Sequence, residues 1–519
     1  AAAGSGKTKV LVERLFSYVE REGANLDDFL IITYTRAAAS ELRGKIAKAL
    51  TERMERDPGN YHLRQQMLRV YRADIKTVDA FCTALLRENC HLLGEDARGH
   101  ALRPDFRVLD ENEAQVLRER VLARTLDDFY DCLTPGGTLL ADTLGAGRDD
   151  SALEDLVLEL HAKLQAQPYE DKWLEAQRAF WRAVPDKIED TPYGKILLNE
   201  VRRKARHCKN LLQRAAQEMC ANDALNQKYA PAFLDASYQL EALEGKTAEG
   251  WDAARGVTIA FPRLAAVKDS DGGEMKARMK SLWDNCKETV KGFAEIFSAS
   301  SDEAVEDLRT MAPAMLALID LTADFSRRYN EEKRRRNSAD FSDQEHEAIR
   351  LLIGEDGAPT ELARIVSARY REIMVDEYQD TNEVQNRIFD AISCKGENLF
   401  TVGDVKQSIY RFRLADPRIF LQHYNTWPPL EDAEEHDSAK LLLSRNFRSR
   451  KEVLDATNFI FCNILSEEMG ELDYGADEML RLGANYVESS ACGAEFHLLD
   501  LPTQTGEQRV RASEAEAAF

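Results

Sequence analysis

The chain has 519 residues, of which 69 are Lys or Arg and 91 are Asp or Glu, so its formal net charge is −22. At about 150 residues per domain this length predicts three or four domains, and a hydrophobic content of 44% excludes a disordered chain. No apolar run approaches the roughly 18 residues of a membrane-spanning helix, so we expect a cytoplasmic protein without a membrane partner. The scattered cysteines form no C-x-x-C pair, which argues against a disulfide scaffold or a zinc site.

Residues 1–100 are expected to begin an α/β domain. Residues 8–20 and 37–50 carry apolar side chains at helical spacing, and 29–33 form the short apolar run of a buried parallel strand. Helix, strand and helix after a glycine-rich start indicate a doubly wound parallel sheet.

The first eight residues fit a phosphate-binding loop that opens a helix, with Ala in place of the first Gly. Small residues let backbone N–H groups face phosphates, while Lys7 reaches the β- and γ-phosphates and the Thr8 hydroxyl ligates Mg²⁺. The alternative, a chance glycine-rich turn, is disfavoured because G-S-G-K-T leads directly into a helix. The residues expected to bind ATP here are Ala1, Ala2, Ala3, Gly4, Ser5, Gly6, Lys7 and Thr8.

The pattern changes between residues 101 and 330, where long charged amphipathic stretches are broken at 134–137 and 269–273 and no convincing strand occurs. Asp110 followed by Glu113 predicts a capping box at the start of a helix. We therefore expect a mostly helical insertion. Apolar runs at 372–375 and 399–402 restore the α/β pattern in residues 331–430, and residues 431–519 open another domain.

The strand predicted at 372–375 ends in two adjacent acids, Asp376 and Glu377. At the carboxyl edge of a sheet, Asp376 can hold Mg²⁺ through water, and Glu377 is placed to polarise an attacking water. Alone, this pair could equally be a solvated loop. Combined with a phosphate loop on the same sheet it predicts nucleotide hydrolysis.

A third segment follows the run at 399–402. Gln407 is placed to sense a γ-phosphate, while Tyr410, Phe412 and Arg413 alternate aromatic and cationic side chains. Such alternation suits single-stranded nucleic acid, because every base offers a π face. The alternative is that Phe412 belongs to the core and the arginines make surface ion pairs.

These segments, in this order, resemble the motifs of UvrD-like superfamily 1 DNA helicases. Besides the three above, the similar stretches are T-Y-T-R-A-A at 33–38, T-V-D-A-F-C at 77–82 and R-N-F-R-S at 445–449. Within that superfamily, residues 402–420, 340–343 and 106–110 are similar to AddA subunits of AddAB helicase–nucleases.

The resemblance implies a P-loop RecA-like parallel-sheet motor domain built from residues 1–100 and 331–430. It also implies a large, mostly helical insertion at 101–330 and the start of a second RecA-like motor domain at 431–519. Lys7, Asp376, Glu377 and Gln407 would serve ATP hydrolysis, Arg448 would reach the γ-phosphate from the second motor domain, and Lys9 would approach the adenine. The residues implied for the DNA track are Tyr34, Thr35, Arg36, Thr77, Phe81, Tyr410, Phe412 and Arg413.

The function implied is an ATP- and Mg²⁺-dependent 3′–5′ DNA helicase or translocase of a helicase–nuclease complex in double-strand break repair and recombination. Its partners would be a single-stranded DNA track, a duplex end and, in a heterodimer, an AddB-like nuclease/helicase subunit. The alternatives are a UvrD/Rep-type helicase without nuclease and, from another class, a P-loop ATPase acting on protein. Because the chain lacks an initial Met and stops in a polar stretch, we expect a longer parent protein that would carry any nuclease domain.

The net charge also hides local basic runs, at residues 202–214, 327–336 and 440–451. The acidity therefore does not exclude DNA binding, and we expect these runs to supply local positive charge.

Overall fold

The computed structural model describes residues 4–96, 98–144, 151–393, 396–411, 414–434, 437–486 and 493–495, with the backbone alone at 269–272 and 468–469. The chain divides into two compact units. The sheet unit comprises residues 1–117, 165–168 and 330–519, and the helical unit comprises 118–164 and 169–329. In the described part of the chain, none of the helices combines the length and apolar character needed to cross a bilayer.

The sheet unit is built on four parallel strands in the order β2-β1-β5-β6. The two central strands, β1 (Phe29–Thr33) and β5 (Glu372–Val375), are buried along their whole length, as the apolar runs predict. The predicted run at 399–402 forms the edge strand β6 (Leu399–Thr401). The sequence analysis missed the other edge strand, β2 (Asp74–Thr77), because its alternating polar residues make no apolar run.

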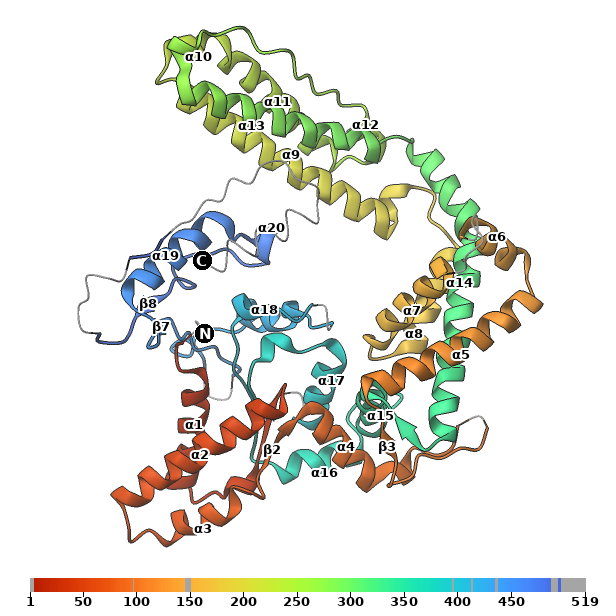
Figure 1. Ribbon diagram of the computed structural model, residues 1–519, viewed down its shortest axis with the longest axis vertical. Coiled ribbons are helices and arrows are strands. Elements are labelled where there is room, and N and C mark those ends of the chain that lie inside the picture. Colours follow the sequence, from red (N-terminus) through yellow and green to blue (C-terminus); the bar gives the residue numbers. More distant parts are fainter. Residues whose placement is uncertain are drawn as a thin grey trace. The chain divides into compact units, whose positions relative to one another are not determined.

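Two helices that flank β1 in sequence confirm the predicted helical spacing. The helix α1 (Lys7–Arg21) buries Leu11, Leu15 and Val19, and α2 (Arg36–Arg56) buries residues of its own stripe. These side chains share one core cluster with β1 and Met374 of β5. Figure 1 shows both helices beside the strands at the amino-terminal end of the chain. The packing of α1 on the sheet fixes the position of the loop that precedes this helix.

The remaining elements of the sheet unit surround this core or follow it in sequence. The helices are α3 (Tyr61–Arg69), α4 (Val78–Asn89), α15 (Phe341–Leu352), α16 (Glu361–Arg369), α17 (Glu383–Ile392), α18 (Pro417–Thr426), α19 (Lys451–Ile464) and α20 (Glu467–Gly470). The strands β7 (Arg445–Asn446) and β8 (Arg481–Leu482) pair in parallel, as do β3 (Arg107–Val108) and β4 (Ser338–Ala339).

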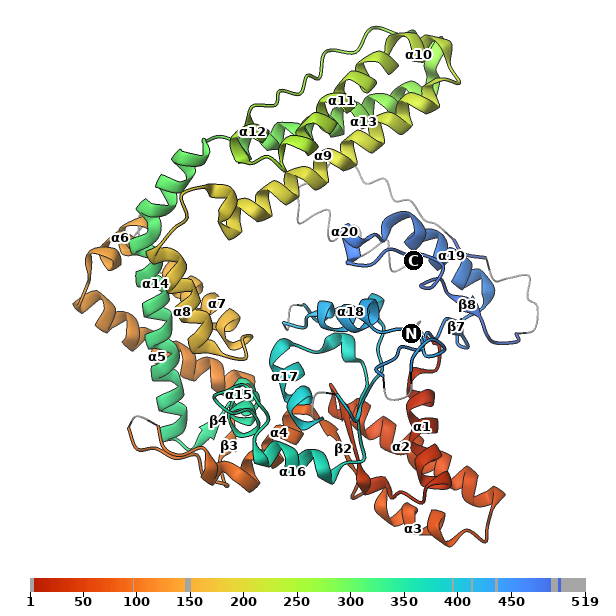
Figure 2. The same cartoon turned by 180° about the vertical axis from the view of Figure 1, so that it is seen from behind.

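The helical unit contains no strand among its described residues. Its helices, three of which extend into the sheet unit, are α5 (Glu111–Asp131), α6 (Pro135–Leu144), α7 (Ser151–Gln165), α8 (Glu170–Arg182), α9 (Pro192–Met219), α10 (Asp223–Lys228), α11 (Ala230–Lys246), α12 (Trp251–Arg255), α13 (Asp269–Ile296) and α14 (Ser301–Arg335). Figure 2 shows the extended segment between α12 and α13 running along the bundle of α9, α11 and α13.

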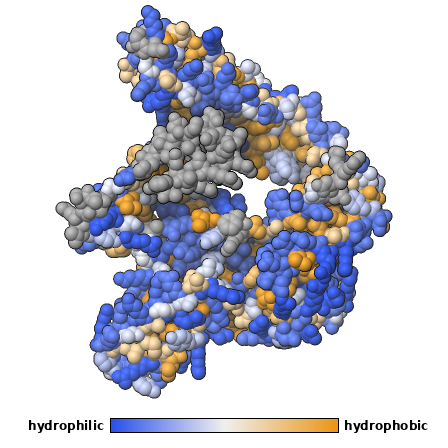
Figure 3. Space-filling view, viewed as in Figure 1, coloured by the Kyte–Doolittle hydropathy of each residue, from blue (hydrophilic) through white to orange (hydrophobic). Residues whose placement is uncertain are grey.

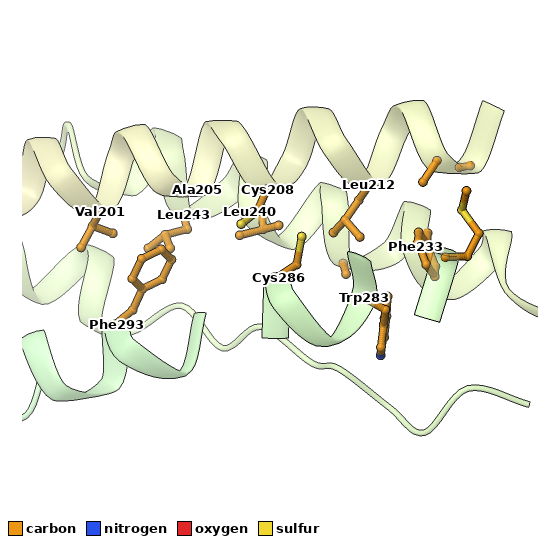
Figure 4. Packing of buried hydrophobic residues seen from close by; sticks show 14 of the residues in the cluster. Val201, Ala205, Cys208, Leu212, Phe233, Leu240, Leu243, Trp283, Cys286 and Phe293 are labelled. Atoms are coloured by element: carbon orange, nitrogen blue, oxygen red, sulfur yellow. The ribbon is translucent and has the colours of Figure 1, made fainter. Parts of the chain in front are cut away.

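The bundle core follows from helical periodicity. Apolar residues recur every three or four positions along α9 and face those of α11 and α13. Figure 4 shows the contact, with Val201, Ala205, Cys208 and Leu212 on α9 opposite Trp283, Cys286 and Phe293 on α13. These buried apolar side chains form one cluster, and their removal from water stabilises the bundle.

One detail of the predicted insertion is corrected. The region 101–330 does contain a strand, β3, which pairs with β4 across 230 intervening residues and belongs to the sheet unit. The break predicted at 269–273 is confirmed as a kink within α13, where Gly273 adopts a non-helical conformation with φ 48°. The predicted capping box is confirmed, since the Glu113 N–H donates to Asp110 Oδ1 at 2.9 Å and the Asp110 N–H to Glu113 Oε2 at 3.4 Å. The assignment of four domain segments remains a prediction.

Hydrophilic residues cover most of the face drawn in Figure 3, with apolar residues in scattered groups. Such a surface agrees with the high charged fraction of the sequence, 31%. Surface hydropathy does not mark a functional site on this face. The candidate site lies at the carboxyl edge of the sheet.

Candidate functional site

The loop before α1 has the backbone of an anion site. Gly4 and Gly6 have φ values of 66° and 87°, in the left-handed region that glycine adopts without strain. Gly6 is also the N-cap of α1, and no side chain caps the first amides of the helix. Those amides are left for an anion at the helix N-terminus. The residues Ala1, Ala2 and Ala3 lie outside the described residues.

The hydroxyl of Ser5 adds a polar group inside this loop. Ser5 is only 6% exposed, and its Oγ has no hydrogen-bond partner in the portion of the chain that is described. A buried hydroxyl without a partner is costly, which fits a loop that closes around a polar ligand.

The predicted acids lie at the carboxyl end of β5. The Asp376 N–H donates to the Ile32 carbonyl at 3.0 Å, so the sheet register carries Asp376 to the edge beside β1. Burial raises the pKa of Asp376, and the neighbouring charge of Glu377 raises it further. Glu377 itself has φ 53°, a left-handed conformation that is uncommon outside glycine. This turn directs the Glu377 carboxylate to the phosphate loop.

Lys7, Glu377 and Gln407 meet at one point, although they are far apart in sequence. Lys7 Nζ lies 2.6 Å from Glu377 Oε2 and 3.3 Å from Gln407 Oε1. The Lys7 side chain is 10% exposed and that of Glu377 is 43% exposed, so the lysine is shielded from water while the carboxylate is open to it. The structure thus places three residues of the predicted catalytic set in mutual contact.

A second layer of polar residues holds this group, and the sequence analysis did not assign it. Gln379 Nε2 donates to Glu377 Oε2 at 3.0 Å, and Gln407 Nε2 donates to Asp404 Oδ2 at 2.7 Å. Asp404 is 2% exposed and pairs with Lys406 Nζ at 2.9 Å. Gln379 follows Glu377 by two residues, and Asp404 lies within the stretch 402–420. The sequence gives these positions along the chain, but not the groups that the two side chains contact.

The residues that follow β7 contact the phosphate loop that precedes α1. The Phe447 N–H donates to the Gly4 carbonyl at 2.9 Å. The buried Asn446 accepts the N–H groups of Arg448 and Ser449 with its Oδ1, at 2.8 and 2.7 Å. Arg448 is therefore fixed by its backbone next to the phosphate loop, with its side chain exposed.

These residues line a cavity of about 570 Å³. Its walls include Gly4, Ser5, Gly6, Lys7, Thr8, Lys9, Glu377, Gln407 and Arg448. Lys45 and Lys48 of α2 also line it and were missed by the sequence analysis, because nothing in a helical lysine distinguishes it from a solvated one. The concentration of lysines suits a polyanionic ligand.

Replacing Gly4 by Ala is expected to weaken nucleotide binding at least tenfold and to lower the free energy of unfolding by roughly 1–3 kcal/mol. Alanine at φ 66° is strained, and its Cβ would lie 2.8 Å from Arg448 Cβ and 2.9 Å from Asn446 Nδ2. Titration with a fluorescent ATP analogue, together with urea unfolding, measures both effects. Gly44→Ala is the control, since a Cβ there meets nothing within 4 Å. Unchanged affinity in Gly4→Ala would contradict the loop assignment.

The residues predicted to hold Mg²⁺ fit the ion. Thr8 lines the cavity, and Asp376 lies at the carboxyl end of β5. Together they offer one hydroxyl and one carboxylate to the ion. Among the described residues no group of three His, Cys, Asp or Glu side chains is arranged to hold a metal. Mg²⁺ bound through one or two protein oxygens and substrate phosphates needs no such group.

The residues predicted for the DNA track take varied positions. Thr35 caps α2 and Thr77 caps α4, each accepting a backbone N–H, at 3.0 and 3.2 Å. Phe81 is 5% exposed, so its ring is packed in the core in this structure. The Tyr34 hydroxyl contacts that of Thr381 at 2.5 Å. Thr77 and Phe81 therefore offer little surface to a base here.

Other members of that set are more accessible. Arg36 is exposed and Tyr410 is half-buried. Phe412 and Arg413 lie outside the described residues, so their alternatives stay open. The whole DNA assignment stays a prediction.

A buried acid, Glu345, lies near Asp79 beside these residues. Gln385 Nε2 donates to Glu345 Oε1 at 2.7 Å, and Glu345 is 8% exposed. Burial raises the pKa of Glu345 to about 7, with the charge of Asp79 adding to the rise and the Gln385 amide opposing it. Burial likewise raises the pKa of Asp79, which Arg36 opposes.

Replacing Glu345 by Gln is expected to stabilise the protein at pH 8 by up to about 3 kcal/mol. Between the unfolded pKa of 4.5 and the folded pKa of about 7, the native state binds more protons than the unfolded state. Wild-type stability therefore falls as the pH rises through this window, and the advantage of the variant vanishes near pH 4.5. Urea unfolding at several pH values measures this, with the exposed Glu361→Gln as control. An equal difference at all pH values would contradict the ionisation of a buried carboxyl.

Basic side chains in two of the runs noted in the sequence form ion pairs with acids. In the run 202–214, Arg206 and Lys209 pair with Glu244, while Arg203 and Lys204 pair with Glu200. The run 327–336 is paired with acids in the same way. The bases of both runs thus have acidic neighbours, and their contribution of local positive charge stays a prediction.

Comparisons with known proteins agree with this geometry. The profile of the UvrD/REP helicase N-terminal domain matches residues 1–428. The chain is 34% identical over 99% of its length to an ATP-dependent helicase/nuclease subunit of Ruminiclostridium cellulolyticum. It is 36% identical over 96% of its length to the proteins of that name from Acetivibrio thermocellus and Desulfitobacterium hafniense. The chain spans about two fifths of these relatives, 42%, 41% and 37% of their lengths.

Proposed function

Because the chain belongs to the UvrD/REP helicase family, we propose that it forms the ATP-hydrolysing part of a DNA helicase or translocase that acts in DNA repair. The observation that carries this proposal is the meeting of Lys7, Glu377 and Gln407 at the rim of a cavity that Arg448 also lines. This group unites a phosphate-binding lysine, a carboxylate and two γ-phosphate sensors in one place.

We further propose that the sheet unit holds a RecA-like motor domain with the start of a second one. Its support is a parallel sheet with a phosphate loop leading into α1 and acids at the end of β5. Residues 445–449 would belong to the second motor domain, and their contact with Gly4 suits a nucleotide held between two such domains. The helical unit would be the insertion in the first domain.

ATP hydrolysis would use the residues as follows. Lys7 neutralises the β- and γ-phosphates, Glu377 orients and polarises the water that attacks the γ-phosphorus, and Arg448 stabilises the charge of the transition state. Gln407 contacts the γ-phosphate and leads into the segment of Tyr410. Thr8 and Asp376 would hold Mg²⁺, which when bound neutralises phosphate charge.

The DNA would run over the carboxyl edge of the sheet as a single strand. Tyr34, Arg36, Tyr410, Phe412 and Arg413 are proposed to contact it, since stacking and cationic contacts suit any base sequence. Closure of the two motor domains on ATP and reopening after hydrolysis would step the protein along that strand, in the 3′–5′ direction.

The relatives' name, which describes each of them as one subunit of a helicase/nuclease, supports an assembly with a second protein. We propose that this partner is an AddB-like nuclease/helicase subunit and that the setting is double-strand break repair and recombination. A UvrD/Rep-type helicase without nuclease is the alternative within the family.

A strand-displacement assay tests the proposed function and its polarity. A labelled duplex with a 3′ single-stranded tail should be unwound with ATP and Mg²⁺, whereas the same duplex with a 5′ tail should not. Lys7→Ala is the matched inactive variant. Lys287→Ala, at an exposed lysine of α13 outside the lining of the cavity, makes the same charge change and should unwind like the wild type. Unwinding of only the 5′-tailed duplex would contradict the polarity, and ATP-independent unwinding would contradict a motor.

A further inference from the structure

Gln379 lies between the Glu377 carboxylate and the segment 403–408, and its side-chain amide binds both. Its Nε2 donates to Glu377 Oε2 at 3.0 Å, and its Oε1 accepts the Asp404 N–H at 2.8 Å. Gln379 is 1% exposed and Asp404 is 2% exposed, so the bond between them is shielded from water, whereas the Glu377 side chain is 43% exposed. The side-chain amide therefore connects the Glu377 carboxylate to the Asp404 backbone, and the two hydrogen bonds fix its orientation.

Two further contacts, at Gly403 and Ser408, hold the segment 403–408 close to Gln379. A Cβ on Gly403 would lie 2.7 Å from Gln379 Oε1 and 3.3 Å from its backbone nitrogen, so the approach requires glycine. The Ser408 hydroxyl donates to the Gln379 carbonyl at 3.3 Å, which ties the far end of the segment to the same residue. The segment between these contacts carries Gln407, whose amide binds the buried Asp404.

Glu377 Oε2 also accepts Lys7 Nζ at 2.6 Å. A γ-phosphate in the cavity would compete with this carboxylate for the lysine ammonium. Once Lys7 turns to the phosphate, Gln379 is the remaining side-chain donor to that oxygen among the described residues. The position of Glu377 would then depend on Gln379.

We propose that Gln379 is a positioning residue that couples the water-activating Glu377 to the segment 403–408. The inference rests on the proposed function for the role of Glu377. A shift of the segment, which leads into Tyr410, moves Asp404 and with it the amide that orients the carboxylate. DNA bound near Tyr410 would in this way affect the position of the attacking water. The two hydrogen bonds that connect them run from the Asp404 N–H to Gln379 and from Gln379 to Glu377.

The link is tested first by hydrogen exchange in the full chain, with and without a non-hydrolysable ATP analogue and Mg²⁺. In the wild type, the analogue should slow exchange of the Asp404 amide. In Gln379→Met, this amide should exchange about fivefold faster without analogue, and the response to analogue should disappear. The matched control is Gln344→Met. Gln344 is also 1% exposed, and its Nε2 donates to the Asp340 carbonyl at 3.2 Å away from the cavity.

Steady-state kinetics test the catalytic consequence. Gln379→Met should lower kcat about 10²-fold, because a displaced general base loses that much, while KM for ATP changes little. Gln379→Glu should lose activity too, since it keeps an acceptor for Asp404 but faces Glu377 with a second carboxylate. Gln344→Met should keep the wild-type kcat even if its melting temperature falls equally.

The outcomes separate the inference from the proposed function. A nucleotide response of the Asp404 amide that persists in Gln379→Met would overturn the inference, whether or not the chain hydrolyses ATP. Equal kcat losses in Gln379→Met and Gln344→Met would also overturn it. An exchange response that needs Gln379 in a chain without hydrolysis would uphold the link while the proposed function fails.

Discussion

Replacing Glu377 by Gln is expected to lower ATP turnover by roughly 10²- to 10⁴-fold, the contribution of a general base, while ATP still binds. The amide keeps the shape of the side chain and a contact for Lys7, which lies 2.6 Å away, but cannot accept a proton from water. Phosphate release under single-turnover conditions measures the chemical step, and titration with a fluorescent analogue measures affinity.

The matched control for Glu377 is Glu13→Gln. Glu13 lines the same cavity, yet its carboxylate pairs with Arg53 at 2.7 Å. Its loss should leave turnover within a factor of about three, as for a partly exposed ion pair worth less than about 1 kcal/mol. If Glu377→Gln retained wild-type turnover, a different group would have to activate the water.

Replacing Arg448 by Ala is expected to lower turnover by about 10³- to 10⁵-fold, the range of an arginine finger in related nucleotide hydrolases. The loss should fall on kcat, because the guanidinium stabilises charge that develops in the transition state. The fold should be unaffected, since the Arg448 side chain is exposed and Asn446 holds only its backbone. Single-turnover hydrolysis and a thermal melt distinguish the two effects.

Arg445→Ala provides the control for that experiment, because Arg445 is an exposed arginine on β7, three residues before Arg448, and is outside the lining of the cavity. Equal losses in both variants would indicate a general electrostatic effect of positive charge near the phosphates. A loss in Arg448→Ala that appears only in KM would contradict the role of a finger.

Much of the site could be predicted from the sequence, because its residues are in short motifs whose spacing reflects strand ends and helix starts. Lys7 opens α1, and Glu377 follows the apolar run of β5, so both positions follow from local pattern. Their 2.6 Å contact depends on the register of β1 against β5, which pairs residues more than 300 positions apart. Local periodicity carries no information on such pairing.

The residues that sequence reasoning missed act through tertiary contacts. Gln379 and Asn446 are amides whose roles depend on which backbone they meet, and Lys45 lines the cavity only because α2 packs beside α1. Phe81, an aromatic residue of a quoted motif, is packed in the core of the sheet unit, and its assignment to the DNA track stays a prediction.

The central claim is that this site hydrolyses ATP under the control of single-stranded DNA. ATP turnover measured with and without an unstructured single-stranded oligonucleotide tests it most directly, with Glu377→Gln as the blank. We expect turnover that rises at least tenfold with the oligonucleotide and is absent in the variant. Glu377-dependent turnover that is unchanged by the oligonucleotide would contradict the claim and favour a P-loop ATPase that acts on protein.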